Sequence, residues 1–258
     1  MSSPPRSELD RLRIQARAWA PAAASLLEQL GVGPGWACAD LGCGPIGILD
    51  LLARRVGRGG RVVGVDRQPA ALLAALEATR RLPNVTLVPA ALPATGLPRG
   101  SFDFVHARFV GQETGAGPLV DEMLALVRPG GWIALEEPGR DPWTLDPAPP
   151  DYERIAPRVA GRFLRRRGAV GPALLDQLRR RGLRRIGSRI HQLTFRGGHP
   201  YASMPAFALA GARAWLAAHG VPRPILARLA ESLAAAATDR RVGHRSFPLW
   251  QVWGRRPA

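Results

Sequence analysis

Short apolar runs alternate along the first half of the chain with segments whose apolar residues recur every three or four positions. Five runs, at 36–41, 61–65, 85–88, 101–106 and 132–136, have the length of buried strands. Alternating strands and helices indicate an α/β fold with a parallel sheet. The helices between the strands are expected near 46–56, 69–81 and 118–127.

Two helices are expected before the first strand. Residues 8–20 have apolar residues at helical spacing, and Pro21 stands where a proline is tolerated in the first turn of a helix. A second helix is therefore expected from Pro21 to a stop at Gly31. These helices form the predicted N-terminal segment, residues 1–35.

The regular alternation of strands and helices ends at a Pro-rich stretch, residues 140–150. We expect a core at 36–138, and helical cap elements, the last helix and two C-terminal strands of the same domain at 139–258. The predicted fold is a Rossmann-like, open, mostly parallel seven-stranded sheet with helices on both faces and a helical cap at 140–182 and 198–242. Its late elements are helices at 151–167, 172–182, 202–219 and 224–238, a β-like stretch at 184–195 and a last strand at 248–254.

Composition narrows the class of protein. With 46% apolar residues in 258, the chain has enough material for a core, which excludes wholesale disorder. No apolar run reaches the ~18 residues of a membrane span, and no secretory leader is recognised, so we expect a cytoplasmic protein without a membrane partner. Cys38 and Cys43 have neither disulfide-framework nor zinc spacing, and no acidic or His cluster has ligand spacing, so no metal is expected.

The charge balance is strongly basic. All 36 basic residues are Arg, against 20 acidic residues, which gives a net charge of +16. The absence of Lys, together with the excess of Ala, Gly and Pro, indicates a GC-rich coding background. A solvated surface is the preferred interpretation; contact with a polyanion is the alternative, because such an excess attracts polyanions at low salt.

Three features fall at the carboxyl ends of the predicted strands, where open α/β sheets bind ligands. A glycine turn, Asp40–Gly47, lies between the first strand and its helix and allows close approach of a ligand to the backbone. Asp66 ends the second strand, where a carboxylate can accept both hydroxyls of a ribose. Residues 101–106 end the fourth strand beside the same cleft.

The chain carries four motifs in order: Ala39–Gly44, Val63–Asp66, Ser101–Val105 and Leu126–Trp132. Together they resemble the motifs of the class I S-adenosylmethionine-dependent methyltransferases, and the likeness covers residues 8–137. The resemblance implies S-adenosylmethionine as the cofactor. The last strand, 250–256, is similar to that of small-molecule members from actinobacteria. A nicotinamide dehydrogenase is the alternative for the glycine turn alone.

The resemblance implies that Gly42 and Gly44 border the methionine part of the cofactor and that Asp40 positions its amino group. It further implies that Asp66 holds the ribose diol and that Arg67 lies beside the adenine. The cofactor-binding residues expected in this way are Asp40, Gly42, Gly44, Gly47, Asp66, Arg67, Ala91 and His106.

Ala91 is the main departure from the family pattern. It stands where members often place an Asp that binds the adenine amino group. A backbone group at this position then has to serve instead, or the affinity for adenine is reduced.

Two residues are candidates for catalysis. His106, at the end of strand four, is expected to face the sulfonium methyl as a general base or as a group that positions the acceptor; the alternative is a place in the cofactor wall. Glu137 follows strand five and is the better cleft candidate of Glu136 and Glu137. A base accelerates transfer to a hydroxyl by about 10²–10⁴-fold.

The expected function is in-line methyl transfer to a small molecule, such as a natural product with an aromatic or polycyclic ring. Binding of the cofactor without methyl transfer, in a cyclase or binding role, is an alternative. RNA methylation is another, although we expect no nucleic-acid partner. The protein is expected to be a monomer or a homodimer. Aromatic residues that line an acceptor pocket, or simply pack the cap, are Trp143, Tyr152, Phe163, Phe195, Tyr201, Phe207 and Trp215.

Overall fold

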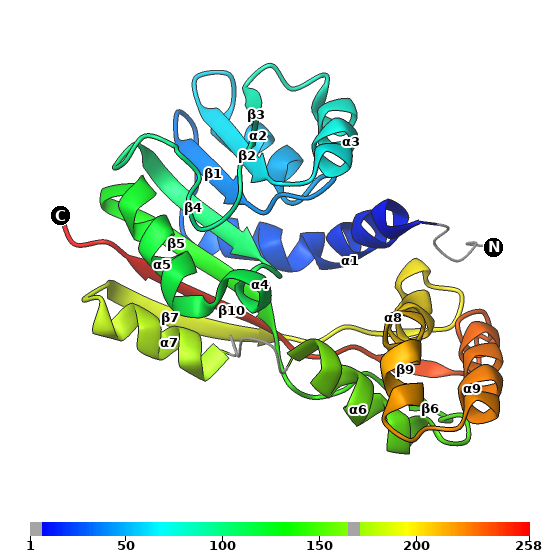
Figure 1. Cartoon of the computed structure of the whole chain (residues 1–258). Helices are drawn as coiled ribbons and strands as arrows, with labels where there is room; N and C mark the ends of the chain where they lie inside the picture. The colour runs from blue at the N-terminus through cyan, green and yellow to red at the C-terminus, as the bar shows by residue number, and fades with distance from the viewer. Residues whose placement is uncertain (1–6, 165–170) are drawn as a thin grey trace. The chain divides into compact units, whose positions relative to one another are not determined.

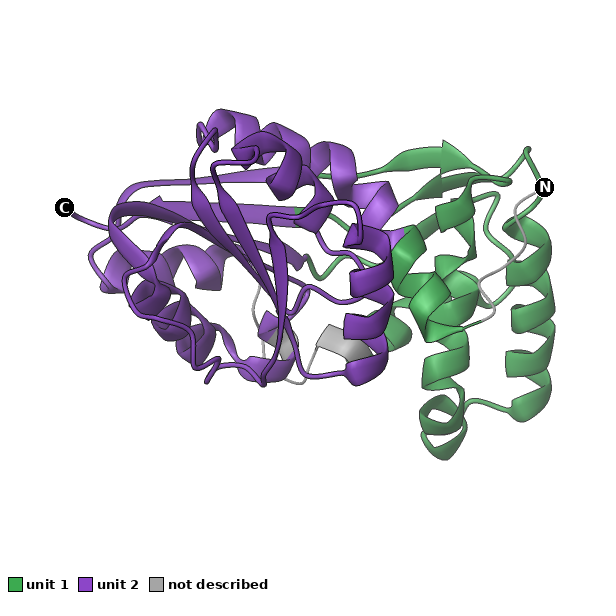
Figure 2. Ribbon diagram, turned by 90° about the horizontal axis from the view of Figure 1, so that it is seen from above, with its two compact units in different colours: residues 1–14, 139–166, 191–249 green, residues 15–138, 167–190, 250–258 purple. Residues whose placement is uncertain are grey.

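The computed structural model describes residues 7–164 and 171–258, whose course is traced in Figure 1. Their contacts divide the chain into two compact units, coloured separately in Figure 2. Unit 1 comprises residues 1–14, 139–166 and 191–249. Unit 2 comprises residues 15–138, 167–190 and 250–258, so the chain crosses between the units several times.

Unit 2 is built on a seven-stranded sheet with the order β3-β2-β1-β4-β5-β10-β7. β1 pairs in parallel with both β2 and β4, and β2–β3 and β4–β5 are also parallel. The predicted seven-stranded, mostly parallel sheet is therefore confirmed. The strands are β1 (Ala37–Leu41), β2 (Arg61–Asp66), β3 (Val85–Pro89), β4 (Phe102–Arg108), β5 (Val127–Pro138), β7 (Arg184–His191) and β10 (Leu249–Arg255).

The strand order reverses between β1 and β4, which makes the carboxyl end of β1 the switch point where such sheets bind ligands. One core cluster packs Ile48 and Leu49 against Phe104, and a second packs Leu119 and Leu174 on residues such as Val105. Because neighbouring residues of a strand point to opposite faces, both faces of the sheet are covered. The helices of unit 2 besides α1 are α2 (Leu49–Val56), α3 (Pro69–Thr79), α4 (Gly111–Thr114), α5 (Ala116–Leu126) and α7 (Gly171–Arg180).

The expected pair of N-terminal helices is wrong: α1 is one helix, Glu8–Gln29, with Pro21 inside it. A proline inside a helix removes one backbone hydrogen bond and costs about 3 kcal/mol. Pro21 is exposed, so water can reach the carbonyl group that loses its partner, while Trp19 and Leu27 are fully buried. Burial of this apolar face offsets the cost and keeps the helix continuous.

Other boundaries also differ from the expectation. β4 continues two residues past His106, and β5 begins at Val127, so it includes residues 128–131, which lay between the expected helix and strand. The helix predicted at 172–182 as part of the cap is α7, whose Leu174 and Leu178 lie in the core of unit 2. Helical periodicity predicted the helix correctly but not the surface it covers.

Unit 1 contains the rest of the predicted cap, but it is not purely helical. Besides its helices it has a small antiparallel sheet in the order β6-β9-β8. Each strand has only three residues, too few to produce a readable alternation. No helix in the described part of the chain is long and apolar enough to cross a membrane. The elements are β6 (Thr144–Asp146), α6 (Tyr152–Leu164), β8 (Thr194–Arg196), η1 (Pro200–Ser203), α8 (Met204–Ala218), α9 (Arg223–Ala236) and β9 (Gly243–Arg245).

Candidate functional site

The glycine turn follows β1 directly and is tied to the neighbouring strand. Gly42, Gly44 and Gly47 all have positive φ angles, of 71°, 55° and 50°. This region of backbone conformation favours glycine because a Cβ is strained there. The N–H groups of Gly42 and Cys43 both donate to the carbonyl oxygen of Val65, at 2.7 and 2.9 Å, which holds the turn against β2.

The three glycines differ in the space around them. A Cβ on Gly42 would overlap Val110 Cγ1, and one on Gly47 would overlap Asp40 Oδ2. A Cβ on Gly44 would meet no atom of the described chain within 4 Å. Of the three glycines, Gly44 is therefore the one with open space beside its Cα.

Asp66 lies at the end of β2 beside Gly44. Its Oδ2 accepts a hydrogen bond from Gly44 N at 2.9 Å, and its Oδ1 accepts one from Gln68 N at 2.9 Å. A carboxylate offers about four acceptor positions, so each oxygen keeps one for a ligand donor. A half-buried carboxylate beside an open glycine fits the ribose diol and the neighbouring part of S-adenosylmethionine.

Two predicted adenine contacts have other neighbours in the structure. Arg67 makes an exposed ion pair with Glu113 of α4, at 3.0 Å. Ala91 is exposed, and its carbonyl oxygen accepts a hydrogen bond from Ala94 N at 3.1 Å. Their contacts with adenine remain predictions. The next residue, Leu92, places Cδ1 3.8 Å from the Gly42 Cβ position, so this loop reaches the glycine turn.

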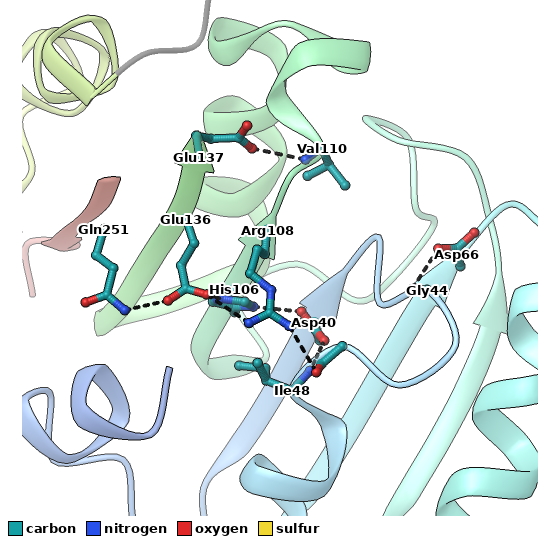
Figure 3. A network of polar contacts seen from close by, with 11 residues as sticks. Asp40, Gly44, Ile48, Asp66, His106, Arg108, Val110, Glu136, Glu137 and Gln251 are labelled. Atoms are coloured by element: carbon teal, nitrogen blue, oxygen red, sulfur yellow. Dashed lines mark hydrogen bonds and ion pairs between the residues drawn. The ribbon is translucent and has the colours of Figure 1, made fainter. Parts of the chain in front are cut away.

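His106 does not end its strand; it lies within the sheet between two carboxylates (Figure 3). Its Nδ1 is 2.7 Å from Asp40 Oδ1 and its Nε2 is 3.5 Å from Glu136 Oε2, and the side chain is 1% exposed. Asp40 Oδ2 also accepts a hydrogen bond from Ile48 N at 3.1 Å. This arrangement corrects the expectation that His106 faces the sulfonium methyl, because both ring nitrogens are directed at carboxylates.

Charge pairing keeps His106 protonated. Burial by itself lowers the pKa of a histidine, but the hydrogen bond and ion pair with Asp40, and the pairing with Glu136, outweigh burial and raise the pKa of His106 to about 9. Burial likewise opposes ionisation of Glu136, yet His106 and Arg108 hold the pKa of this carboxyl below its usual value. A protonated His106 has no lone pair to accept a proton from a substrate.

Glu137 points to the opposite face of β5 from Glu136 and is also fully buried. Its Oε1 accepts hydrogen bonds from Val110 N at 3.0 Å and Gly111 N at 2.8 Å, while Oε2 has no partner among the described residues. Burial is the largest influence and raises the pKa of Glu137 to about 8, against the two N–H donors. Glu137 thus holds the loop after β4 through one of its two carboxyl oxygens.

Cys38, Cys43 and Asp103 also have structural roles. Burial raises the pKa of Cys38 and of Cys43 well above the usual value, so these thiols act as small apolar residues. Asp103 links the starts of neighbouring strands. Its Oδ2 accepts a hydrogen bond from the backbone N–H of Ala37 at 2.7 Å, and its Oδ1 pairs with Arg128 Nε at 2.5 Å.

Four residues of the site region were not predicted from the sequence: Val110, Leu92, Arg108 and Gln251. Val110 and Leu92 are ordinary apolar residues in loops, and no local pattern marks them. Arg108 did carry a signal, because it stands two residues after His106 and so shares a strand face with it. Gln251 is a polar residue inside an apolar strand, which is a signal for a buried partner.

Three of the aromatic residues expected to line a pocket, Trp143, Phe195 and Tyr201, pack against one another inside unit 1. Trp143 is 5.0 Å from Tyr201 and 5.7 Å from Phe195 between ring centroids, and Tyr152 Oη donates to Trp143 O at 2.8 Å. Trp143, Tyr152 and Tyr201 are buried. The core-packing interpretation therefore applies to these three. The side chain of Phe163 lies outside the described residues.

Comparisons with known proteins find similarity to methyltransferases. A family model described as a methyltransferase domain matches residues 38–131. Nocamycin O-methyltransferase of Saccharothrix syringae is 34% identical over 181 residues, 63% of this chain and 64% of the relative. An uncharacterized 37.1 kDa protein in transposon TN4556 of Streptomyces fradiae is 32% identical over 151 residues, 58% of this chain and 44% of that protein. The chain thus spans less than two thirds of either relative.

Solved structures share the fold at low identity. Geranyl diphosphate C-methyltransferase of Streptomyces coelicolor A3(2) has a TM-score of 0.57 at 17% identity, covering 98% of this chain and 87% of that one. Phosphoethanolamine N-methyltransferase 2 of Haemonchus contortus has a TM-score of 0.60 at 15% identity, covering 98% and 59%. The first was determined with S-adenosyl-L-homocysteine and the second with S-adenosyl-L-methionine.

Proposed function

Because the chain belongs to the class I S-adenosylmethionine-dependent methyltransferase family, we propose that it transfers a methyl group from this cofactor to a small molecule. The single observation that carries the proposal is the pairing of an open Gly44 with the Asp66 carboxylate at the end of β2. Asp66 would hold the ribose diol, and Gly42 and Gly44 would border the methionine part. When bound, the cofactor supplies an electrophilic methyl group.

Asp66→Ala tests the cofactor site. The substitution removes the acceptors for the ribose diol, so we expect S-adenosylmethionine and S-adenosylhomocysteine to bind at least about tenfold more weakly, or 1.4 kcal/mol. Isothermal titration calorimetry measures this directly. Asp103→Ala is the matched control, because it removes a carboxylate at the opposite end of the sheet. Absence of binding in the folded wild type would refute the cofactor assignment.

An oxygen atom of the acceptor is the proposed methylation site. Nocamycin O-methyltransferase is named for transfer to oxygen, and the present chain has a buried carboxyl, Glu137, with one free oxygen among its described contacts. Transfer to a hydroxyl benefits from a base, whereas a neutral amine needs one less. We propose Glu137 rather than His106 as that base, since His106 is held protonated by Asp40 and Glu136.

Glu137 predicts a distinctive pH–rate profile. A base must be deprotonated to act, and the pKa of Glu137 is about 8, so the rate of methyl transfer is expected to rise with pH up to about 8. In Glu137→Gln the rate is expected to fall by about 10²-fold and to lose this rise. The measurement is S-adenosylhomocysteine formation with small phenols and hydroxylated polycyclic compounds as acceptors. A profile that is unchanged in Glu137→Gln excludes the residue as the base.

Retention of the cofactor without methyl transfer is the second candidate function. It is favoured by one observation: both predicted catalytic residues, His106 and Glu137, are buried. Turnover of a substrate without S-adenosylhomocysteine would establish this role, and a product heavier by one methyl group would exclude it. Methylation of RNA predicts binding that weakens steeply with salt, which a filter-binding titration distinguishes.

A further inference from the structure

The buried charges around His106 extend to the end of the glycine turn. Arg108 stands two residues after His106 on the same face of β4, and its Nη1 lies 3.4 Å from Glu136 Oε2. Its Nη2 donates to the carbonyl oxygen of Gly47 at 3.2 Å. One guanidinium therefore joins the centre of the sheet to the last residue of the turn, as Figure 3 shows for Arg108 and its neighbours.

The other end of this network is anchored in α1. Gln251 of β10 donates from Nε2 both to Glu136 Oε1 at 2.5 Å and to the carbonyl oxygen of Ala22 at 2.9 Å. Glu136 is thus held from two sides, by Gln251 and by Arg108. A fully buried carboxylate with fixed donors on both oxygens gives Arg108 a rigid partner.

The turn is held at adjacent residues by two members of the network. Asp40 accepts from Ile48 N, and Arg108 donates to Gly47 O. Gly47 has no room to shift toward Asp40, because a Cβ there would overlap Asp40 Oδ2. The start of the turn is held by Val65 and Asp66 of β2, and its end, residues 47–48, is held by side chains of β1 and β4.

We propose that Arg108 is a positioning residue for the cofactor, which holds the glycine turn in its binding conformation by bridging Glu136 and Gly47 O. The inference rests on the proposed function for the identity of the ligand. Arg108 itself does not contact the reacting atoms; it acts through the turn. A guanidinium suits this task because it directs several N–H groups in a fixed plane, whereas an ammonium is a compact charge on a flexible stem.

Charge balance is the competing explanation for Arg108. Asp40 and Glu136 are buried anions, and His106 and Arg108 are the cations that face them from β4. Removing one partner of a buried ion pair is strongly destabilising because the other charge is left uncompensated. The test therefore has to separate the loss of the hydrogen bond to Gly47 O from the loss of the positive charge that neutralises Glu136.

Two variants make this separation. Arg108→Lys keeps the positive charge but replaces the planar fork, and the double variant Arg108→Met/Glu136→Gln removes both charges together while Asp40 and His106 still balance each other. Arg128→Met is the control, because Arg128 forms an exposed ion pair with Asp103 at the other end of β4. Thermal unfolding of each variant identifies those that fold.

We expect both variants to bind S-adenosylmethionine about tenfold more weakly by calorimetry, with Arg128→Met unchanged. In the methyl-transfer assay the KM for S-adenosylmethionine is expected to rise while kcat at saturating cofactor changes little. Wild-type affinity in Arg108→Lys, or in the double variant, would overturn the proposal, because neutralisation of Glu136 would then explain Arg108 completely.

A second measurement does not depend on the cofactor. Hydrogen–deuterium exchange of the protein alone reports on the turn, because Gly44 N and Ile48 N are both hydrogen-bonded to carboxylates. We expect residues 42–48 to exchange faster in Arg108→Lys, with the rest of β1 and β4 unchanged. Failure of the wild type to bind S-adenosylmethionine would refute the proposed function alone, whereas unchanged exchange of the turn in Arg108→Lys would refute the positioning role.

Discussion

Gly47→Ala is expected to abolish measurable cofactor binding. The added Cβ would overlap Asp40 Oδ2 and lie 2.7 Å from Cys43 O, at a φ angle of 50° that already strains an L residue. The atoms it meets include backbone and a carboxylate fixed by His106, so the turn itself has to move. Strain of this kind costs on the order of 1–3 kcal/mol before the clash is counted. We expect at least a hundredfold weaker binding in calorimetry.

Two glycine controls separate backbone strain from loss of the turn. Gly100 has a φ angle of 62°, a Cβ added there would meet no described atom within 4 Å, and the residue lies before β4, away from the turn. Gly100→Ala therefore carries the strain alone and should leave cofactor binding intact. Gly44→Ala meets open space within the chain, so it should fold like Gly100→Ala but weaken binding by occupying the ligand position. Equal affinities in Gly47→Ala and Gly100→Ala would contradict the prediction.

The free energy of unfolding is expected to fall steeply between pH 6.5 and pH 9. The pKa of His106 is about 9 in the folded protein against 6.5 when unfolded, so the folded state holds the extra proton across this window. Its stabilisation is complete below pH 6.5 and is lost as pH rises through 9, a change on the order of 3 kcal/mol.

Glu137 acts in the same direction in an overlapping window. Its pKa is about 8 in the folded protein against 4.5 when unfolded, so the folded state again binds more protons as pH rises from 4.5 to 8. Between pH 6.5 and 8 this adds a loss of about 2 kcal/mol. Urea unfolding at several pH values measures the sum.

Single variants assign the two contributions. Glu137→Gln resembles the protonated acid, so it should be nearly as stable as the wild type at pH 6.5 and should lose stability less steeply up to pH 8. His106→Gln should be destabilised at pH 6.5, where Asp40 and Glu136 lose their shared cation, and should have a flatter dependence up to pH 9. Stability that stays constant or rises from pH 6.5 to 9 would show that neither group is held protonated in the folded state.

The local sequence determined much of the sheet and where the candidate cofactor site lies. Short apolar runs and intervening helical periodicity predict the parallel strands, because burial on both faces imposes those patterns. Glycine is favoured where the backbone adopts positive φ, so the closely spaced glycines after the first strand predict the turn there. Asp66 could be assigned to the same edge because parallel strands end together.

The tertiary structure decided which partners each candidate residue has. His106 and Glu137 look equivalent in sequence, as polar residues near strand ends. β4 extends past His106 and aims it at Asp40 and Glu136, whereas Glu137 faces the loop after its neighbouring strand. Whether a buried group keeps a free lone pair depends on partners from other strands, and a single strand's sequence does not specify them.

The same physical reason explains the errors in the remaining elements. The sequence predicts that a helix begins at Pro21, but burial of Trp19 and Leu27 keeps α1 continuous through this residue. The sequence places α7 in the cap, but its Leu174 and Leu178 belong to the core of unit 2. Local pattern determines that an apolar face exists, and the surface that covers this face is chosen only when distant segments pack together.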